Sequence, residues 1–479
     1  MELHDVLKGK FGYEQFRKGQ EPIIRRLLRG ENQIAILPTG GGKSLCYQLP
    51  AYLVDGLVVI ISPLVALMED QVAQLKKQGE KRVAALNSFN NWQQRRLILS
   101  NLPHYKFLFI SPEMLMSEQL QKQLANVHIA YLVVDEAHCI SQWGFDFRPD
   151  YLRLQTFFKQ RPNCPVLALT ATADEKVIED IQFYLNLSTV HVEKTSLNRQ
   201  NISYELIKMT DEEEKTKWLV EHLKQTTGPG VIYVGSRKRA DELAALLSKH
   251  CSGIQSYHAG LEKEDRALIQ AQFISGEVNW ICATNAFGMG IHKDDVRQVI
   301  HEHIPASMAN YIQEVGRAGR DGKRAHATMI FVEEDLQKTR FIMLEDFPTA
   351  AIVRDIGQQM KYQSLKEVAD FFALNETMTR VLHYYLSHYS IEEAVLKIEE
   401  QRQAKEQHFK KMTTFIETSH CLRQEVLKNF GEHDFTKSEN CCSNCGLQPL
   451  TFLNQQNTME NCAQRIDWQE RLSQLLGDA

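Results

Sequence analysis

The chain has 479 residues, of which 43% are hydrophobic and 24% are charged, as in an ordinary globular protein with a sizeable core. At about 150 residues per domain, this length predicts roughly three domains. A net charge of −5 excludes a uniformly basic nucleic-acid-binding protein but leaves room for a local basic groove. No signal-peptide pattern opens the chain, and no apolar run reaches the ~18 residues of a membrane span, so we expect a cytoplasmic protein without membrane contact.

The first informative segment is FGYEQFRKGQ, about twenty residues before a glycine-rich loop. The Gln20 amide offers both a donor and an acceptor, which suits the edge of an adenine ring, and Tyr13 offers a face for stacking. Taken alone, the segment reads equally as the aromatic start of a helix.

The loop itself reads Leu37-Pro38-Thr39-Gly40-Gly41-Gly42-Lys43-Ser44 and lies between an apolar run and a helix-compatible stretch. Its glycines let backbone N–H groups wrap closely around a phosphate at a helix N-terminus. Lys43 is spaced to reach the β- and γ-phosphates of a nucleotide, and the Ser44 hydroxyl to hold Mg²⁺. Leu37 stands where the Walker A pattern has glycine, and a glycine-rich turn with a chance Lys-Ser pair is the alternative.

Short β-branched runs at 57–61, 107–110, 131–134 and 166–169 alternate with helical patterns. The alternation predicts a doubly wound parallel α/β sheet, which binds ligands beyond the carboxyl ends of its strands. Asp135 and Glu136 directly follow the run at 131–134. Asp135 can orient Mg²⁺ through water, and Glu136 can polarise the attacking water; two solvated carboxylates are the alternative.

An aromatic loop comes next, at 141–150, with Trp143, Phe145, Phe147 and Arg148 in a stretch that also holds a glycine and a proline. A loop this aromatic is usually buried. Beside a nucleotide site we expect it instead to stack on bases and to report their presence to the ATP chemistry.

Residues 198–208 are expected to cross over to a second βα series, with strands at 230–234, 254–258, 280–283, 299–301 and 328–332. This series has no phosphate loop but carries the segment QEVGRAGRDG, which holds Gln313, Arg317 and Arg320. Two arginines three residues apart can enter a neighbouring lobe's active site and neutralise charge on the γ-phosphoryl group. A solvated basic turn is the alternative.

In family order, over about residues 10–330, the chain carries FGYEQFRKGQ, LPTGGGKS, SPLVALMEDQV, DEAHCISQWGFDFRPDY, LALTATA, YHAGL, ATNAFGMGI and QEVGRAGRDG. It thereby resembles the RecQ helicases of superfamily 2, and its aromatic loop is similar to RecQ rather than to the RNA-unwinding DEAD and DEAH families. The resemblance implies two RecA-like P-loop NTPase lobes and ATP-dependent 3′→5′ DNA unwinding or remodelling in recombination and repair.

The resemblance also implies roles for individual residues. Phe145 departs from the pattern, since many relatives carry histidine there. The implied residues are Tyr13, Arg17, Gln20, Thr39, Gly40, Gly41, Gly42, Lys43 and Ser44 for the nucleotide; Ser44 and Asp135 for Mg²⁺; Lys43, Asp135, Glu136, Gln313, Arg317 and Arg320 for hydrolysis; and Trp143, Phe145, Phe147 and Arg148 for DNA coupling.

Residues 349–420 turn helical. The stretch 364–387 reads as helix–turn–helix, with Ser364 and Glu367 at capping-box spacing, and 391–415 as a long charged helix. A DNA-reading helix and two packed helices without a DNA role are both open readings.

A cysteine cluster follows, with Cys421 twenty residues before Cys441, Cys442 and Cys445. A CxxC pair with a distant third cysteine predicts a structural, tetrahedral Zn²⁺ site of four thiolates. Adjacent cysteines are unusual as ligands, so His433 or Cys462 could replace one of them, and a disulfide is a poor alternative in a reducing cytosol. RecQ proteins carry a comparable helix-plus-zinc module here, usually with two arginines where this chain has Leu422-Arg423. Because only thirty-four residues follow Cys445, we expect a short RecQ without the winged-helix and HRDC domains.

The predicted organisation is a first RecA-like lobe over 1–200, a second over 201–345, a helical region over 346–405, a helix plus zinc-binding module over 406–447 and a tail over 448–479. The expected cofactors are ATP, Mg²⁺ and Zn²⁺. We expect a monomer that binds single-stranded, forked or partly duplex DNA, with a single-strand-binding protein or repair factors as further partners. If the source is bacterial, we expect it to be associated with the nucleoid. The rival functions are a DNA-stimulated ATPase that translocates without unwinding, a DNA-binding scaffold with an inactive ATPase, and an enzyme that acts on RNA.

Replacing Trp143 or Arg148 with alanine should leave basal ATP hydrolysis near normal and remove its stimulation by DNA, because the loop lies eight residues past Asp135 and is more aromatic than a solvent loop needs. Steady-state ATP hydrolysis with and without single-stranded DNA measures this. Unchanged stimulation in both variants would return the loop to a packing role.

Overall fold

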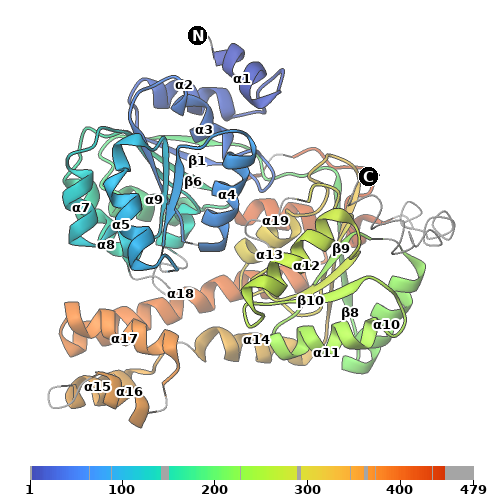
Figure 1. Ribbon diagram of the computed structural model, residues 1–479. Helices are drawn as coiled ribbons and strands as arrows, with labels where there is room; N and C mark the ends of the chain where they lie inside the picture. Colours follow the sequence, from blue (N-terminus) through green and yellow to red (C-terminus); the bar gives the residue numbers. More distant parts are fainter. Residues whose placement is uncertain are drawn as a thin grey trace, which may run out of the picture.

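The computed structural model describes residues 3–63, 65–87, 89–141, 150–226, 228–287, 293–345, 347–360, 365–372, 374–433 and 435–447. They form two α/β lobes, a group of helices and a short cysteine-bearing segment (Figure 1). None of the helices in these ranges combines the length and the apolar character that a bilayer span requires.

The first lobe is built on a seven-stranded sheet in the order β3-β4-β2-β5-β6-β1-β7, and all its strand pairs are parallel. Its inner strands are buried along almost their whole length because helices cover both faces, which is why they read as continuous apolar runs. The strands are β1 (Gln33–Ile36), β2 (Leu57–Ile61), β3 (Val83–Leu86), β4 (Phe107–Ile110), β5 (Ile129–Val134), β6 (Val166–Thr170) and β7 (His191–Lys194).

The helices of the first lobe alternate with these strands. They are α1 (Leu3–Phe11), α2 (Gln20–Leu28), α3 (Leu45–Ala51), α4 (Val65–Lys77), α5 (Trp92–Ser100), α6 (Pro112–Leu115), α7 (Glu118–Leu124), α8 (Asp150–Lys159) and α9 (Glu175–Tyr184), with 3₁₀ turns η1 (Leu102–His104) and η2 (Ala137–Ile140).

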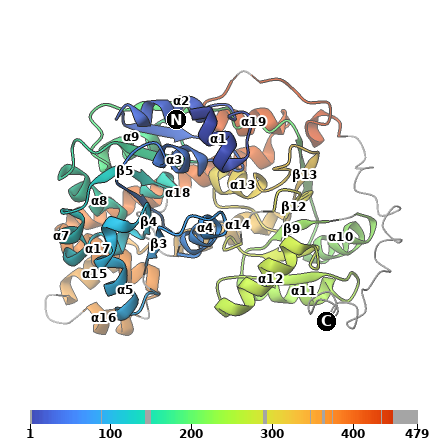
Figure 2. The same cartoon turned by 45° about the horizontal axis from the view of Figure 1, so that its top comes forward.

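The second lobe has a six-stranded parallel sheet in the order β10-β11-β9-β12-β13-β8. In Figure 2, α13 lies on the side of this lobe that faces the first lobe. The elements are β8 (Ile202–Lys208), α10 (Glu212–Gln225), β9 (Gly230–Tyr233), α11 (Arg237–Leu247), β10 (Ile254–Tyr257), α12 (Lys263–Ser275), β11 (Trp280–Ala283), β12 (Gln298–His301), α13 (Met308–Val315), β13 (Ala325–Phe331) and α14 (Glu333–Glu345).

The two parallel lobes confirm the predicted fold class, and one expected element is wrong. Residues 198–208 do not form a crossover throughout, because Ile202–Lys208 is β8 and pairs with β13 along its whole length. The polar residues of β8 conceal the apolar pattern by which a buried strand is usually predicted. One of them, Glu205, accepts hydrogen bonds from the side chains of His326 and Thr328 on β13. The connection between the lobes is therefore short, and residues 195–201 are called the crossover segment below.

The remaining helices are α15 (Ala350–Gln359), α16 (Leu365–Phe371), α17 (Glu376–His388), α18 (Ile391–Glu417) and α19 (Leu422–Asn429), followed by the 3₁₀ turn η3 (Ser443–Cys445). The first half of α18 packs with α15–α17 in a small core of their own, and its second half joins the core of the second lobe through Phe409, Met412 and Phe415. Figure 1 shows α18 passing beneath the first lobe, where Lys411 pairs with Asp174 at 3.9 Å.

Two expectations about this region are not decided by the helices. Ser364, the expected cap of the helix–turn–helix, lies outside the described residues, so the choice between a DNA-reading helix and a packed pair stays open. The domain limits also stay predictions, and the one expected between 405 and 406 falls inside α18.

Candidate active site

The glycine-rich loop (the phosphate loop, residues 37–44) joins β1 to α3 at the carboxyl edge of the first sheet. Gly40 and Gly42 have φ values of 81° and 75°, in the left-handed region that glycine adopts without strain. The Gly41 N–H closes the turn on the Pro38 carbonyl at 2.9 Å, and Ser44 immediately precedes the helix. The backbone is thus shaped to surround a phosphate.

Across this loop, Lys43 and Glu136 form an ion pair, with Nζ and Oε1 3.2 Å apart. Burial alone would raise the pKa of Glu136, but Lys43 and then His138 lower it below its ordinary value. Asp135 keeps some exposed surface, yet its carboxylate loses much of its hydration, and this loss together with Glu136 raises the pKa of Asp135 to about 6. The surroundings therefore shift the pKa values of the two neighbouring carboxylates in opposite directions, with Glu136 held by Lys43.

His138 links these carboxylates to the end of β6, a role that the sequence analysis did not give it. Its Nδ1 lies 3.0 Å from the Thr170 hydroxyl and 3.4 Å from Glu136 Oε2. Thr170 in turn donates to the Thr172 carbonyl at 2.9 Å. Burial lowers the pKa of His138, and its ring forms a hydrogen-bonding bridge between two strand ends.

The residues expected to bind adenine lie on the other side of the loop. The Gln20 amide donates to the carbonyls of Gly41 and Gly42, each at 3.1 Å, and accepts from the Arg17 N–H at 2.8 Å. The Arg17 guanidinium donates to the Gly40 carbonyl. Tyr13 is exposed, with its ring open to solvent. Gln20 and Arg17 thus brace the phosphate loop, and their contact with adenine stays a prediction.

Arg317 and Arg320, the two arginines predicted to act as arginine fingers on the γ-phosphoryl group, come from the second lobe and reach the first. Residues 316–322 (the finger segment) follow α13, and a Cβ added at Gly40 would lie 3.0 Å from Arg320 Cγ. Arg317 is buried and close enough to Glu136 to contribute to its lowered pKa. Lost hydration and then Arg317 lower the pKa of Arg320 to about 10. Gln313 lies buried on α13 behind them. The positive charges converge where a triphosphate would lie.

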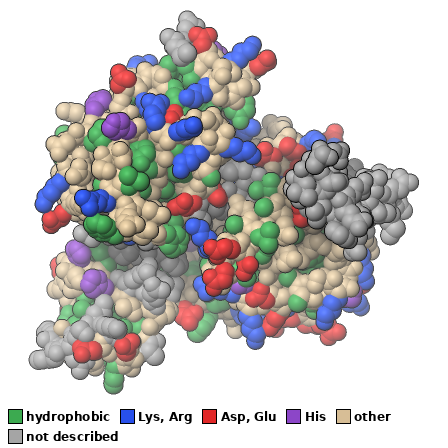
Figure 3. Space-filling model, in the orientation of Figure 1, with side chains coloured by type: hydrophobic (Ala, Val, Ile, Leu, Met, Phe, Trp, Pro, Cys, Tyr) green, Lys and Arg blue, Asp and Glu red, His purple; other side chains and the backbone are tan. Residues whose placement is uncertain are grey.

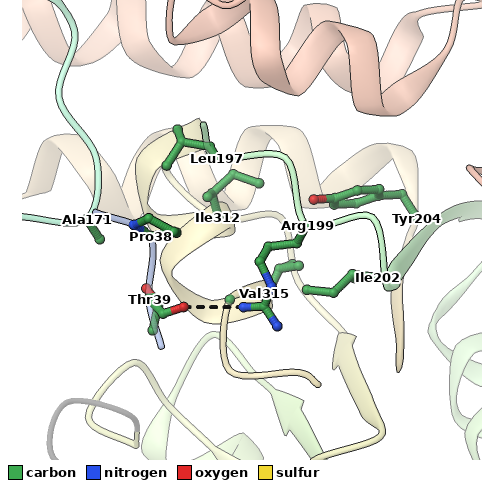
Figure 4. A pocket seen from close by; sticks show the side chains of 10 residues that line it. Pro38, Thr39, Ala171, Leu197, Arg199, Ile202, Tyr204, Ile312 and Val315 are labelled. Carbon is green, nitrogen blue, oxygen red and sulfur yellow. Dashed lines mark hydrogen bonds between the residues drawn. The ribbon is translucent and has the colours of Figure 1, made fainter. Parts of the chain in front are cut away.

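Arg199, on the crossover segment, is a site residue that the sequence analysis missed. Its guanidinium donates to the carbonyl of Thr39 at 3.2 Å (Figure 4) and also to the carbonyls of Ala318 and Gly319. These partners are 160 and about 120 residues away, so no local pattern could have indicated them. The only signal in the sequence is that Arg199 lies between the two βα series, where a side chain can contact both lobes.

The four predicted zinc ligands are brought together by α19 and η3. The sulfur atoms of Cys421, Cys441, Cys442 and Cys445 all lie within 4.8 Å of one another, and Cys421 lies 3.5 Å from Cys441 and 3.9 Å from Cys442. Zn–S bonds of about 2.3 Å in a tetrahedron place sulfur atoms about 3.8 Å apart. All four are free thiols, and the Leu422 N–H donates to Cys442 Sγ at 3.3 Å. The cluster therefore fits Zn²⁺ without a disulfide.

Some predicted residues cannot be placed. Trp143, Phe145, Phe147 and Arg148 lie outside the described residues, as does Cys462, the alternative zinc ligand. His433 is described but is not part of the sulfur cluster. Among the described residues, the adjacent pair Cys441 and Cys442 completes the cluster with Cys421 and Cys445.

Comparison with known families covers most of the chain. Residues 17–181 match the DEAD/DEAH box helicase family, residues 214–322 match the helicase conserved C-terminal domain, and residues 333–446 match the RecQ zinc-binding family. The third match includes the helices α15–α18 as well as the four cysteines.

Two curated relatives match over long stretches. The chain is 40% identical over 484 residues to the probable ATP-dependent DNA helicase RecS of Bacillus subtilis (strain 168), covering 99% of this chain and 97% of that one. It is 39% identical over 390 residues to the ATP-dependent DNA helicase RecQ of Pasteurella multocida (strain Pm70), covering 80% of this chain and 60% of the relative. The chain thus spans nearly all of the first relative and about three-fifths of the second.

Solved structures support the fold. The DEAD-box helicase Mss116, bound to single-stranded RNA and UDP-BeF, has a TM-score of 0.59 at 17% identity, covering 85% of this chain and 90% of that one. The DUF1998 helicase MrfA, bound to DNA, has a TM-score of 0.59 at 18% identity, covering 71% and 53%. With its split phosphate site, its cysteine cluster and these relatives, the chain belongs to the RecQ family of DNA helicases.

Proposed function

We propose that this chain is an ATP-dependent DNA helicase that moves along single-stranded DNA in the 3′→5′ direction and separates or remodels the duplex ahead of it. The observation that carries the proposal is the division of one phosphate site between two lobes, with the side chain of Arg320 against Gly40. Binding or losing a triphosphate at such a site changes how tightly the lobes hold each other, as a stepping motor requires.

In the proposed reaction, each residue around the phosphate loop has one role in binding or hydrolysing ATP. Lys43 leaves Glu136 to bind the β- and γ-phosphates, and the freed Glu136 carboxylate polarises the attacking water. The Ser44 hydroxyl and, through water, the Asp135 carboxylate would hold Mg²⁺, which neutralises phosphate charge. Arg317 and Arg320 oppose the charge that develops on the γ-phosphoryl group. Because the fingers belong to the other lobe, hydrolysis and release loosen the contact between lobes.

A DNA partner is supported by the relatives, which are named ATP-dependent DNA helicases, and by the distribution of charge. Figure 3 shows Lys and Arg side chains gathered on the part of the first lobe that lies toward the second lobe, although the chain carries a net charge of −5. The 3′→5′ polarity follows from the family resemblance. A monomeric state, a cytoplasmic or nucleoid location, and contacts with a single-strand-binding protein or repair factors belong to the same proposal.

We further assign a structural Zn²⁺ to Cys421, Cys441, Cys442 and Cys445. The Leu422 N–H donates to Cys442 Sγ at 3.3 Å and the Arg423 guanidinium to Cys441 Sγ at 3.3 Å, and donors of this kind stabilise thiolate ligands. Four thiolates would leave no open coordination position, so the metal would supply folding free energy and no reaction step.

Replacing Lys43 with alanine should reduce ATP hydrolysis at least about 100-fold and leave single-stranded DNA binding nearly unchanged, because the lysine contacts phosphate and not the strand. Hydrolysis rates and fluorescence anisotropy of labelled DNA measure the two effects. Lys122→Ala, which removes an exposed lysine paired with Glu118, serves as the control and should match the wild type. Hydrolysis within about threefold of the wild type would refute the phosphate role.

Strand displacement on a forked DNA, with a matched RNA fork and with and without ATP, tests the function itself. We expect ATP-dependent displacement of the DNA fork and little of the RNA fork, and a single-stranded 3′ tail should be required. DNA-stimulated hydrolysis without displacement would identify a translocase instead. Displacement that needs a 5′ tail would overturn the proposed polarity.

Metal analysis of single serine variants tests the zinc assignment. One Zn²⁺ per chain is expected in the wild type, and its loss in Cys421→Ser, Cys441→Ser, Cys442→Ser or Cys445→Ser should lower the melting temperature and weaken DNA binding. Cys251→Ser, at a free cysteine of the second lobe, is the control. Full zinc retention in Cys441→Ser together with loss in Cys462→Ser would mean that the tail closes the site.

A further inference from the structure

The side chain of Arg423 is fully buried between the cysteine cluster and the connection of the two lobes. It lies two residues after Cys421, and its Nε donates to Cys441 Sγ at 3.3 Å. Its Nη1 donates to the Asn198 side chain at 3.0 Å and to the Arg199 carbonyl at 2.8 Å. The guanidinium also donates to the Ile202 carbonyl. One side chain thus joins a predicted zinc ligand to the crossover segment.

Other contacts fasten the same two parts together. Residues 421–445, called the cysteine module here, also hold the crossover segment through Glu432, whose carboxylate accepts from the Leu197 N–H at 2.9 Å and from the Ser196 hydroxyl. The Tyr204 N–H donates to the Cys441 carbonyl at 3.2 Å, and the Arg423 guanidinium lies 5.0 Å from the Tyr204 ring centroid. The backbone that carries Arg199 is therefore fixed from the side of the cysteine module.

From that fixed backbone, the Arg199 side chain extends in the opposite direction, into the junction of the lobes (Figure 4). It donates to Thr39, which precedes the glycines of the phosphate loop, and to Ala318 and Gly319, which precede Arg320. Carbonyl oxygens of the two lobes thus converge on one guanidinium. The planar fork of arginine suits this arrangement, because Nη1 donates to one lobe and Nη2 to the other, whereas a lysine ammonium carries all its donors on one nitrogen.

We propose that Arg199 and Arg423 form an arginine relay, in which Arg423 fixes the crossover segment to the cysteine module and Arg199 aligns the finger segment with the phosphate loop. Arg199 is a positioning residue: it acts on hydrolysis through Arg317 and Arg320 and touches no phosphate itself. The inference rests on the proposed function and extends it, since it makes the cysteine module a part of the support of the ATP site and not only a separately folded unit.

The relay predicts a specific kinetic signature. Without Arg199, the phosphate loop keeps its own braces from Gln20 and Arg17, so ATP should still bind. The finger segment loses its shared donor, and a displacement of about 1 Å at a catalytic group can cost up to about 100-fold in rate. A change in kcat with little change in KM is therefore expected, whereas general damage to the fold would lower the melting temperature as well.

DNA-stimulated ATP hydrolysis should be measured for Arg199→Gln, Arg199→Lys, Arg423→Gln and the double variant Arg199→Gln/Arg423→Gln, together with zinc content and melting temperature. Arg199→Gln should lower kcat about tenfold or more with KM for ATP within about threefold, zinc retained and melting temperature unchanged, and Arg199→Lys should recover part of the loss. Because both arginines act in one relay, the double variant should be no slower than Arg199→Gln within about twofold. Arg354→Gln, at an exposed arginine paired with Glu392, is the matched control.

Three outcomes would overturn the relay. A kcat of Arg199→Gln within about twofold of the wild type would deny its positioning role, and multiplied losses in the double variant would deny the link to Arg423. If Arg423→Gln fails to fold, it is replaced by Arg423→Lys, which keeps the positive charge but loses the planar guanidinium. The single and double variants are then judged by the same changes in kcat. A wild-type chain that hydrolyses no ATP would overturn the proposed function together with the relay, whereas an active wild type with an equally active Arg199→Gln would overturn the relay alone.

Discussion

The structure depends on how a cluster of positive charges is held at the junction of two lobes. Lys43 and Arg17 of the first lobe, Arg199 of the crossover segment, and Arg317 and Arg320 of the second meet around the phosphate loop. Glu136 and a few backbone carbonyls offset this charge only in part, and lost hydration and then the neighbouring Arg317 lower the pKa of Arg320. A bound polyphosphate anion would offset this positive charge, and this is the physical basis of the proposed coupling between nucleotide binding and lobe closure.

The fold explains why these groups can meet. In parallel α/β sheets the carboxyl ends of the strands lie at one edge, which places the phosphate loop after β1 and the carboxylates after β5 side by side in the first lobe. The second lobe supplies no such loop and instead directs α13 and the finger segment at this edge. The short crossover segment and the cysteine module then fasten the outer side of the junction. The candidate active site and the attachment of the lobes therefore share the same few residues.

The sequence was informative wherever the determining contacts are local. The placement of the glycine-rich loop between a strand and a helix, the placement of Asp135 and Glu136 after a strand, and most buried strands depend on neighbouring residues, and the structure has them where the sequence predicts them. Strand β8 was mistaken for a connection because Glu205 finds its partners on β13, about 120 residues away. Arg199 and Arg423 were missed for the same reason, since their partners come from both lobes and from the cysteine module. Long-range hydrogen bonds of single polar side chains leave no periodic signal in a sequence.

The central claim is that one triphosphate site is completed by both lobes. A structure of the chain with Mg²⁺ and a non-hydrolysable ATP analogue measures this most directly. We expect Lys43 Nζ to have left Glu136 for the β- and γ-phosphate oxygens, and the guanidinium groups of Arg317 and Arg320 to lie within hydrogen-bonding distance of the γ-phosphate. An analogue bound in the phosphate loop with Lys43 still paired to Glu136, or with both arginines out of reach of the γ-phosphate, would contradict the account.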